Sequence, residues 1–304
     1  MPTPHYLALT LTPGIGAKTA RKLIAHFGSA GDVFAASVED LTAIPRVSRT
    51  IAEQLLASPL EQYEQELLSL DDIGIGVVTL EDEMYPANLR QADGSPVLLF
   101  VRGRLAAADV HAVAVVGSRE ASPRGMEAAK QLAAALADRG LTVVSGLAIG
   151  IDTAAHRGAV DVGGRTLAVL GSGLRVIHPR ENAELAEEIA AQGALLSELH
   201  PDAPPSGPTL MARDRIVSGL ARAVIVVEAG VRSGSLDTAA KALKQGRALY
   251  AVAGSDGTDK LLREGARRVD PDSDLDSLVE EIRAHNLGGE DGGESGPANQ
   301  LGLL

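Results

Sequence analysis

Four short apolar runs in this chain each stop at a loop of small residues, and this feature limits the fold more than any other. The runs with their loops cover residues 113–119, 143–150, 167–173 and 224–229. Each run is rich in β-branched residues and precedes a helix-forming stretch, which predicts buried parallel strands that end along one edge of a sheet. In open α/β sheets this edge binds ligands. Glycine and serine at the strand ends let peptide N–H groups approach an anion, so we expect a phosphate-sized site there.

Length and composition favour two folded units without covalent cross-links. The 304 residues exceed the usual size of one compact core, 45% of them are hydrophobic, and cysteine is absent. The lack of cysteine excludes disulfides and cysteine zinc sites and suits a reducing cytoplasm, where we expect the protein to act. No apolar run approaches membrane-spanning length, and the first residues lack the pattern of a secretion signal, so we expect no membrane association.

The net charge of −12 is unevenly distributed. Nine acidic residues and a single arginine lie between residues 270 and 304, so the remainder of the chain is only mildly acidic. A local basic patch can therefore still bind nucleic acid, although the protein as a whole offers little long-range steering.

The order of the expected elements divides the chain into three parts. Residues 1–70 form an all-helical pattern, residues 71–282 carry the strands, and the Gly- and acid-rich segment 283–304 is predicted to be a disordered tail or linker. Strands and helices alternate in the middle part with short connections, which predicts a parallel sheet with right-handed crossovers. The runs 76–80 and 97–101 are expected to join this sheet or to cover its edge.

The helical part contains a helix-hairpin-helix pattern over residues 11–24. Two glycines permit a tight turn, and three cations follow at the start of the next helix, where backbone N–H groups can hold a DNA phosphate. The duplex-DNA contacts expected from this pattern are Gly14, Gly16, Lys18, Arg21 and Lys22. A second copy at residues 41–51 lacks the glycines and is interpreted as structural. The alternative for the first copy is a helical packing module without a ligand.

Six short motifs follow one another with compatible spacing. They cover residues 115–119, 145–156, 171–173, 197–198, 213–220 and 227–239. Together with the N-terminal hairpin they resemble the DNA-processing protein A family (DprA, also called Smf) as far as about residue 266. The resemblance implies an extended Rossmann-like, mainly parallel α/β sheet with helices on both faces, preceded by a small all-helical (SAM-like) domain. It also implies a recombination mediator that protects single-stranded DNA and loads the RecA recombinase, in natural transformation or in repair, without a cofactor.

Arg119 is the first candidate for a DNA contact, because a guanidinium group clamps a phosphate directionally. The alternative is a structural arginine that pairs with Asp152 or Glu228. The single-stranded DNA contacts expected from the loop ends and the motifs are Gly117, Ser118, Arg119, Ser145, Gly146, Ile149, Gly150, Gly171, Gly173, Arg180, Leu210, Arg213, Arg215, Ser233, Gly234 and Ser235. The alternatives are that the glycines only permit tight turns and that the other arginines are ordinary solvated side chains.

Three positions depart from the family pattern. Asp214 stands between two arginines where the family usually has asparagine, His178 replaces the usual tyrosine, and residues 207–211 lack the usual phenylalanine and lysine. The chain has no tryptophan and few aromatic residues, so a platform for base stacking is not available. Affinity should depend instead on phosphate contacts and on apolar loop residues such as Leu147 and Ile149, with a strong dependence on salt.

Catalysis is the rival interpretation. Glu228, near Ser233 and Thr238, is a carboxylate able to assist hydrolysis of an N-glycosidic bond, as in Rossmann-like phosphoribohydrolases, but their glycine signature is missing. Asp152 and His156 provide two metal ligands without a third, and we expect Asp152 to orient its own loop through hydrogen bonds. No Gly-x-Gly-x-x-Gly with a ribose-binding acid indicates NAD. We therefore expect no catalytic or metal-binding residue, and a protein that is not an enzyme.

The expected assembly follows from the resemblance. Family members dimerise through the segment that aligns with residues 259–265, and RecA binds near that surface. The homodimer contacts implied here are Lys260, Leu261, Leu262 and Glu264. The alternative is that the two leucines are ordinary helix core residues. Two DNA-binding loops on one dimer would let a single strand bridge both subunits, with duplex DNA as a weaker ligand.

Overall fold

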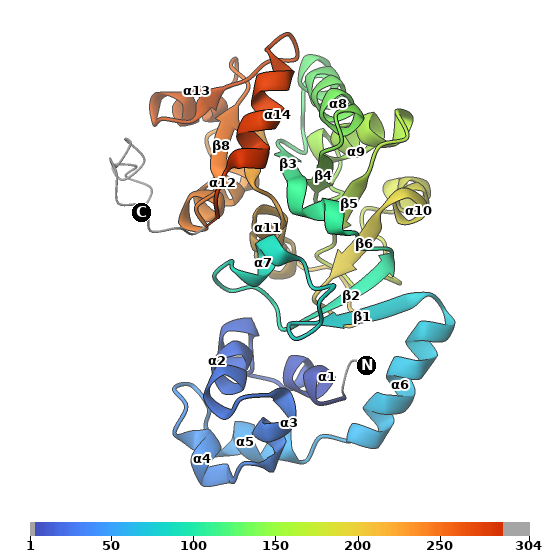
Figure 1. Cartoon of the computed structure of the whole chain (residues 1–304), viewed down its shortest axis with the longest axis vertical. Coiled ribbons are helices and arrows are strands. Elements are labelled where there is room, and N and C mark those ends of the chain that lie inside the picture. The colour runs from blue at the N-terminus through green and yellow to red at the C-terminus, as the bar shows by residue number, and fades with distance from the viewer. Residues whose placement is uncertain (1–3, 288–304) are drawn as a thin grey trace.

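A mixed sheet forms the centre of the protein in the computed structural model, which describes residues 4–287 (Figure 1). Its strands are β1 (Ile75–Thr79), β2 (Leu98–Gly103), β3 (Ala112–Val116), β4 (Thr142–Ser145), β5 (Thr166–Val169), β6 (Ala194–Ser197), β7 (Ala223–Val226), β8 (Ala248–Ala251) and β9 (Arg267–Arg268). Their order in the sheet is β1-β2-β6-β5-β4-β3-β7-β8-β9. The β1–β2 and β2–β6 pairs are antiparallel, and the remaining pairs are parallel.

The expected Rossmann-like sheet is confirmed. The runs 76–80 and 97–101 become β1 and β2, which join the sheet as an antiparallel pair at one edge. The sequence does not predict β9, because Arg267 and Arg268 are both exposed and offer no apolar pattern. Short apolar runs therefore predict the inner strands, but the edge strand β9 has no apolar run and cannot be predicted in this way.

Helices cover both faces of the sheet, as expected. Along β3, Val113 and Val115 belong to the core beneath α8 (Pro123–Asp138), α9 (Ile151–Asp161) and α14 (Leu275–Ala284). Ala114 and Val116 point to the opposite face, since side chains alternate along a strand. That face is covered by α7 (Ala87–Arg90), α11 (Gly207–Leu220), α12 (Gly234–Lys244) and α13 (Asp256–Arg263). Helix α10 (Ala183–Gln192) packs on β2, β5 and β6.

One glycine sets the distance between α8 and α9. A Cβ atom on Gly158 would lie 2.1 Å from the carbonyl oxygen of Lys130 in the facing helix, far inside van der Waals contact. The two helices therefore approach each other at a distance that only glycine permits at this position.

The N-terminal part consists of α1 (Pro4–Leu11), α2 (Ala17–Phe27), α3 (Ala30–Ala35), α4 (Val38–Thr42), α5 (Arg49–Leu56) and α6 (Leu60–Asp72). The turn between α1 and α2 places Gly14 at φ +89°, as the hairpin pattern requires, whereas the turn before α5 has Arg46 at φ +76° in place of a glycine. Leu7 and Leu9 of α1 belong to the same buried cluster as Leu98 and Phe100 of β2. The helices and the sheet thus share one core, and they lie side by side in Figure 1.

Helix α11 begins earlier than the sequence predicts. A helix is expected at 212–220, but α11 starts at Gly207 because Ser206 and Thr209 form a capping box. Helix α14 runs to Ala284, beyond the expected boundary at residue 282. Most of the expected tail, residues 288–304, lies outside the described part of the chain. None of the helices between residues 4 and 287 combines the length and the apolar character that crossing a bilayer requires.

Candidate nucleic-acid interface

The carboxyl ends of β4, β3 and β7 lie next to one another and carry three of the expected loops. These loops hold residues 117–122, 146–150 and 227–233. Helix α11 crosses the same edge, since it contacts β3, β4 and β5. Parallel strands deliver their carboxyl ends to a single edge, so side chains from three loops and one helix meet here.

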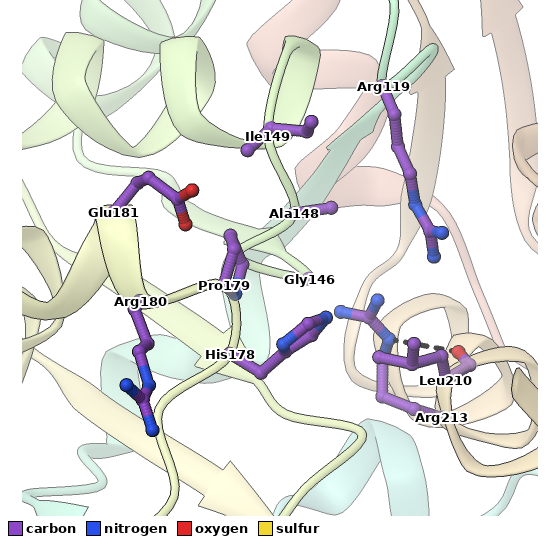
Figure 2. Close-up of a pocket in the computed structure, with 10 residues that line it drawn as sticks. All are labelled: Arg119, Gly146, Ala148, Ile149, His178, Pro179, Arg180, Glu181, Leu210 and Arg213. Atoms are coloured by element: carbon purple, nitrogen blue, oxygen red, sulfur yellow. Dashed lines mark hydrogen bonds between the residues drawn. The ribbon is translucent and has the colours of Figure 1, made fainter. Parts of the chain in front are cut away.

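Two adjoining hollows lie at this edge of the sheet. The first hollow has a volume of about 450 Å³, and Figure 2 shows the residues that line it. The second hollow has a volume of about 730 Å³ and extends over the loop 230–235 to the start of α12. Their shared wall consists of Arg119, Gly146, Ala148, Leu210 and Arg213. Both volumes fall in the range typical of small-ligand sites.

Arg119 lies exposed at the tip of the loop after β3. Its loop is fixed by hydrogen bonds from Ser118 N to Glu228 O (2.7 Å) and from Ile151 N to Ser118 O (3.1 Å). Within residues 4–287 the guanidinium group makes no hydrogen bond or ion pair. The structure does not form the alternative pair with Glu228, whose carboxylate instead accepts hydrogen bonds from Ser122 N and Oγ at 2.9 and 2.5 Å. Asp152, the other proposed partner, is also occupied.

Asp152 orients the loop after β4, as the sequence predicts. Its Oδ2 accepts hydrogen bonds from Gly146 N (3.1 Å) and Ala148 N (3.4 Å). The expectation for Leu147 is wrong: this residue has φ +60° and is fully buried, so it offers no apolar surface to a ligand. Ile149 remains 47% exposed at the rim of the first hollow.

Arg213 forms the floor between the two hollows. Its side chain is only 5% exposed, and Nη1 donates a 2.7 Å hydrogen bond to Val169 O. The guanidinium group lies so close to Gly146 that a Cβ atom there would be 1.7 Å from Nη1. Figure 2 shows the guanidinium groups of Arg119 and Arg213 reaching toward the same space. Two positive charges therefore meet at the shared wall, one exposed on a loop and one buried and held by hydrogen bonds.

The other two arginines of the expected basic track lie elsewhere. Arg215 forms a bidentate ion pair with Glu198, and its Nε donates to Gly94 O at 2.8 Å, so it lines neither hollow. Arg180 lines the first hollow and is exposed, but in Figure 2 its side chain runs away from Arg119 and Arg213. A continuous track of arginines is therefore not formed.

Several expected contacts are buried beneath the hollows instead of lining them. A Cβ atom on Gly171 would lie 2.7 Å from Leu210 Cα, and one on Gly173 would lie 2.1 Å from Pro201 O. Ser145 is fully buried and donates a 2.7 Å hydrogen bond to Val115 O. The two glycines allow α11 and the chain before it to pack closely against the end of β5, and Ser145 links β4 to β3.

The start of α12 lines the second hollow as the sequence predicts. Ser233 caps the helix, and Gly234 and Ser235 follow it along the wall. Gly117 and Ser118 line the opposite wall, where a Cβ atom on Gly117 would lie 2.5 Å from the Ile151 side chain. Gly150 contributes φ +83° to the loop that supports this wall. The lining residues that sequence reasoning missed include Ala148, Met211, Val231, Arg232 and Asp237; all of them lie within two residues of a predicted contact.

Burial changes the ionisation of three groups in and beside the second hollow. It raises the pKa of Asp214 to about 6, although the neighbouring Arg213 acts in the opposite direction. Burial also raises the pKa of Asp152, and it lowers the pKa of His156 to about 3. His156 is therefore neutral at pH 7, with Nδ1 in contact with Thr166 Oγ1 at 2.8 Å. Asp152 and His156 thus have separate structural partners, and no group of metal ligands occurs among residues 4–287.

Two of the three hairpin cations contact the segment between α7 and β2. Lys18 Nζ lies 2.7 Å from Asp93 Oδ2, and Arg21 donates to Ser95 Oγ and, at 3.2 Å, to Arg90 O. Lys22 and the hairpin glycines Gly14 and Gly16 are exposed. Two of the three cations expected to contact duplex DNA are therefore paired with the segment 90–95, and duplex binding by this hairpin stays a prediction.

The expected dimer residues lie on α13. Leu261 is 2% exposed and belongs to the core, so it cannot form a surface patch, whereas Leu262 is partly buried against the same core. Lys260 Nζ lies 3.6 Å from Glu264 Oε1 one turn along the helix. The alternative interpretation of the leucines as core residues is thus correct for Leu261.

The chain matches two family models. Residues 76–283 match the family described as DNA recombination-mediator protein A, and residues 6–58 match the SAM-like helix-hairpin-helix tandem. Protein Smf of Escherichia coli is 42% identical over 235 residues, which are 75% of this chain and 63% of that protein. DNA processing protein DprA of Streptococcus pneumoniae is 42% identical over 200 residues, which are 64% of this chain and 71% of that protein.

Two solved structures share the fold. The X-ray structure of DprA from Streptococcus pneumoniae has a TM-score of 0.81 at 33% identity and covers 92% of this chain and 98% of its own. DNA processing protein A from Helicobacter pylori, described for its single-stranded DNA binding mode, has a TM-score of 0.60 at 29% identity and covers 68% of this chain and 95% of its own.

Proposed function

This chain belongs to the DNA recombination-mediator protein A family, and we propose that it binds single-stranded DNA at the two hollows. The observation that carries the proposal is the placement of Arg119. Its exposed guanidinium group has no hydrogen-bond or ion-pair partner within residues 4–287 and lies over the buried guanidinium group of Arg213. Two like charges at one hollow are stabilised by an anion between them, and a phosphate fits both forks of donors.

In this proposal the strand is held by phosphates at the arginine wall and by bases on aliphatic side chains. Among residues 4–287 no phenylalanine, tyrosine or tryptophan lines either hollow; the apolar rim is formed by Ile149, Leu210, Met211 and Val231. Arg180 and Arg232 lie farther along the two hollows, where neighbouring phosphates would pass. Electrostatic contacts therefore supply most of the affinity, which makes binding strongly dependent on salt.

The finer parts of the proposal rest on family membership. The protein acts in the cytoplasm on strands from DNA uptake or repair, protects them, and helps load RecA. It works as a homodimer, with the exposed side of α13 around Leu262 at the dimer surface. Duplex DNA is a weaker ligand, because Lys18 and Arg21 are engaged with the segment 90–95.

A non-catalytic role is favoured over hydrolysis because Glu228 is occupied. Both of its carboxylate oxygens accept hydrogen bonds from Ser122 at the start of α8. A general base must lie within hydrogen-bond reach of the proton it removes, and both Glu228 oxygens are directed at Ser122. The Glu228 carboxylate, which the sequence suggested as a catalytic group, therefore links the loop after β7 to the start of helix α8.

Fluorescence anisotropy of a labelled (dT)20 strand tests the proposal. Arg119→Ala should weaken binding at low salt about tenfold or more, because one charge-assisted phosphate contact is lost. It should also reduce the slope of log affinity against log salt by about 0.7. Arg124→Ala is the matched control, since Arg124 is exposed on α8 and lines neither hollow. Equal losses in both variants, or no binding by the wild type at low salt, would contradict the proposal.

A further inference from the structure

The second hollow has an acidic end in addition to its arginine wall. Asp152, Asp214 and Asp237 line it together with Arg119 and Arg213. A phosphate is attracted to the arginines and repelled by the aspartates. The acidic end therefore suits a neutral group that carries N–H donors, and in a DNA strand such donors occur only on the edges of the bases.

Only one of the three aspartates accepts no hydrogen bond within residues 4–287. Asp152 accepts hydrogen bonds from two peptide N–H groups of its loop, and Asp237 pairs with Lys241 on α12. Asp214 Oδ1 forms an ion pair with Arg213, with Oδ1 lying 3.2 Å from Nε, but that Nε donates its hydrogen bond to Leu210 O at 3.4 Å. Among residues 4–287 no N–H or O–H group donates a hydrogen bond to the Asp214 carboxylate. It is an acceptor with two oxygens and no donor.

Helix geometry places a base beside this carboxylate. Leu210 precedes Arg213 by three residues and Asp214 by four, so the three side chains lie on neighbouring positions of one face of α11. A base that rests its ring on Leu210 presents its edge to Asp214 while its phosphate remains near Arg119 and Arg213. Val217, one turn farther along α11, closes the hollow behind the base.

We propose, building on the proposed function, that Asp214 reads the Watson–Crick edge of a guanine in the second hollow. Guanine presents two adjacent donors, N1–H and N2–H, which match the two oxygens of a carboxylate. Adenine and cytosine present one amino group beside an acceptor nitrogen, and thymine presents one N3–H between two carbonyl oxygens that a carboxylate repels. Exposed single-stranded bases are commonly recognised through this edge.

Burial makes the match selective. The Asp214 side chain is 16% exposed, so an oxygen without a donor is poorly compensated by water. A site of this kind discriminates strongly against a ligand that lacks the matching group. Guanine satisfies both oxygens, whereas each other base leaves at least one without a partner. We expect about tenfold tighter binding of a strand that offers guanine.

Base substitution in one strand tests the inference without changing the protein. The strands are (dT)20 and the same strand with three isolated dG residues, or with deoxyinosine, which keeps N1–H and lacks the N2 amino group. The wild type should prefer the dG strand about tenfold over (dT)20, and deoxyinosine should remove most of this preference. Asp214→Asn should bring the dG/dT ratio close to one. Glu120→Gln, which removes an exposed carboxylate from the same hollow, should keep the ratio.

The outcomes separate this inference from the proposed function. A wild-type ratio within twofold of one, or a ratio that survives Asp214→Asn, overturns the role of Asp214 while tight binding of (dT)20 still supports the proposed function. An equal ratio for dG and deoxyinosine also overturns it, because the N2 amino group would then have no partner. If no strand binds at low salt, both proposals fail together.

Discussion

Replacing Asp214 by asparagine should stabilise the free protein at neutral pH. Burial raises the pKa of this carboxyl from an ordinary value near 4 to about 6, so the ionised form is less favourable in the folded than in the unfolded chain. A shift of about two pKa units at about 1.4 kcal/mol per unit corresponds to about 2 to 3 kcal/mol. Asparagine has nearly the same shape and carries no charge. The expected gain in the free energy of unfolding at pH 7.5 is therefore about 2 kcal/mol.

The gain must disappear in acid. Because the folded pKa of Asp214 lies above the unfolded one, the folded state binds more protons between about pH 4 and pH 6. The wild type therefore loses stability from this group as the pH rises through that window, and the loss is complete above it. Asparagine avoids the loss, so its advantage is full at pH 7.5 and close to zero at pH 4.

Denaturant unfolding of both proteins at pH 7.5, 5.5 and 4.0 measures this difference. Asp237→Asn is the matched control, because Asp237 is 38% exposed and pairs with Lys241, so its replacement should cost about 0.5 kcal/mol instead of adding stability. The reasoning is refuted if Asp214→Asn destabilises the protein at pH 7.5. A gain that is equal at all three pH values would also refute it, since the effect would not then come from ionisation.

Two further substitutions test packing described above. Gly158→Ala should cost more than about 2 kcal/mol in thermal unfolding, since its Cβ would lie 2.1 Å from Lys130 O. Gly207→Ala is the control and should be nearly neutral, because no atom lies within 4 Å of the new Cβ. Equal effects of the two substitutions would contradict the close approach of α8 and α9. Arg21→Ala should cost about 1 to 3 kcal/mol and speed amide hydrogen exchange in α2, because two hydrogen bonds to the segment 90–95 are lost. Lys22→Ala, at an exposed position, should change neither measurement, and the same loss in both variants would argue against the anchoring role of Arg21.

The sequence was sufficient to predict the inner strands and the edge at which the site lies. The runs before Gly117 and Gly146 are short, β-branched and bounded by small residues, and this pattern alone places strand ends together. The parallel pairing follows from the helices between the strands. The loop role of Asp152 could also be predicted, because its hydrogen bonds are made to residues within six positions along the chain.

The roles of the cations could not be predicted in the same way. Arg213 is fixed by Val169 O and Arg21 by Ser95, which lie 44 and 74 positions away in the sequence. Whether an arginine faces a ligand or a carbonyl group of its own chain depends on such distant partners. Composition and motif spacing contain no information about them. Arg119 differs because its loop ends at the surface.

The buried cluster that α1 shares with β2 affects how such a protein can be inherited. A gene rearrangement that separated the chain near residue 73 would leave Leu98 and Phe100 without their cover. The bared surface would promote self-association of the remaining sheet. The sheet keeps two further buried clusters of its own beneath its covering helices. Loss of the helical part would therefore bare one face of β2 without removing the core of the sheet, and polar residues on that face would have to compensate for the lost cover.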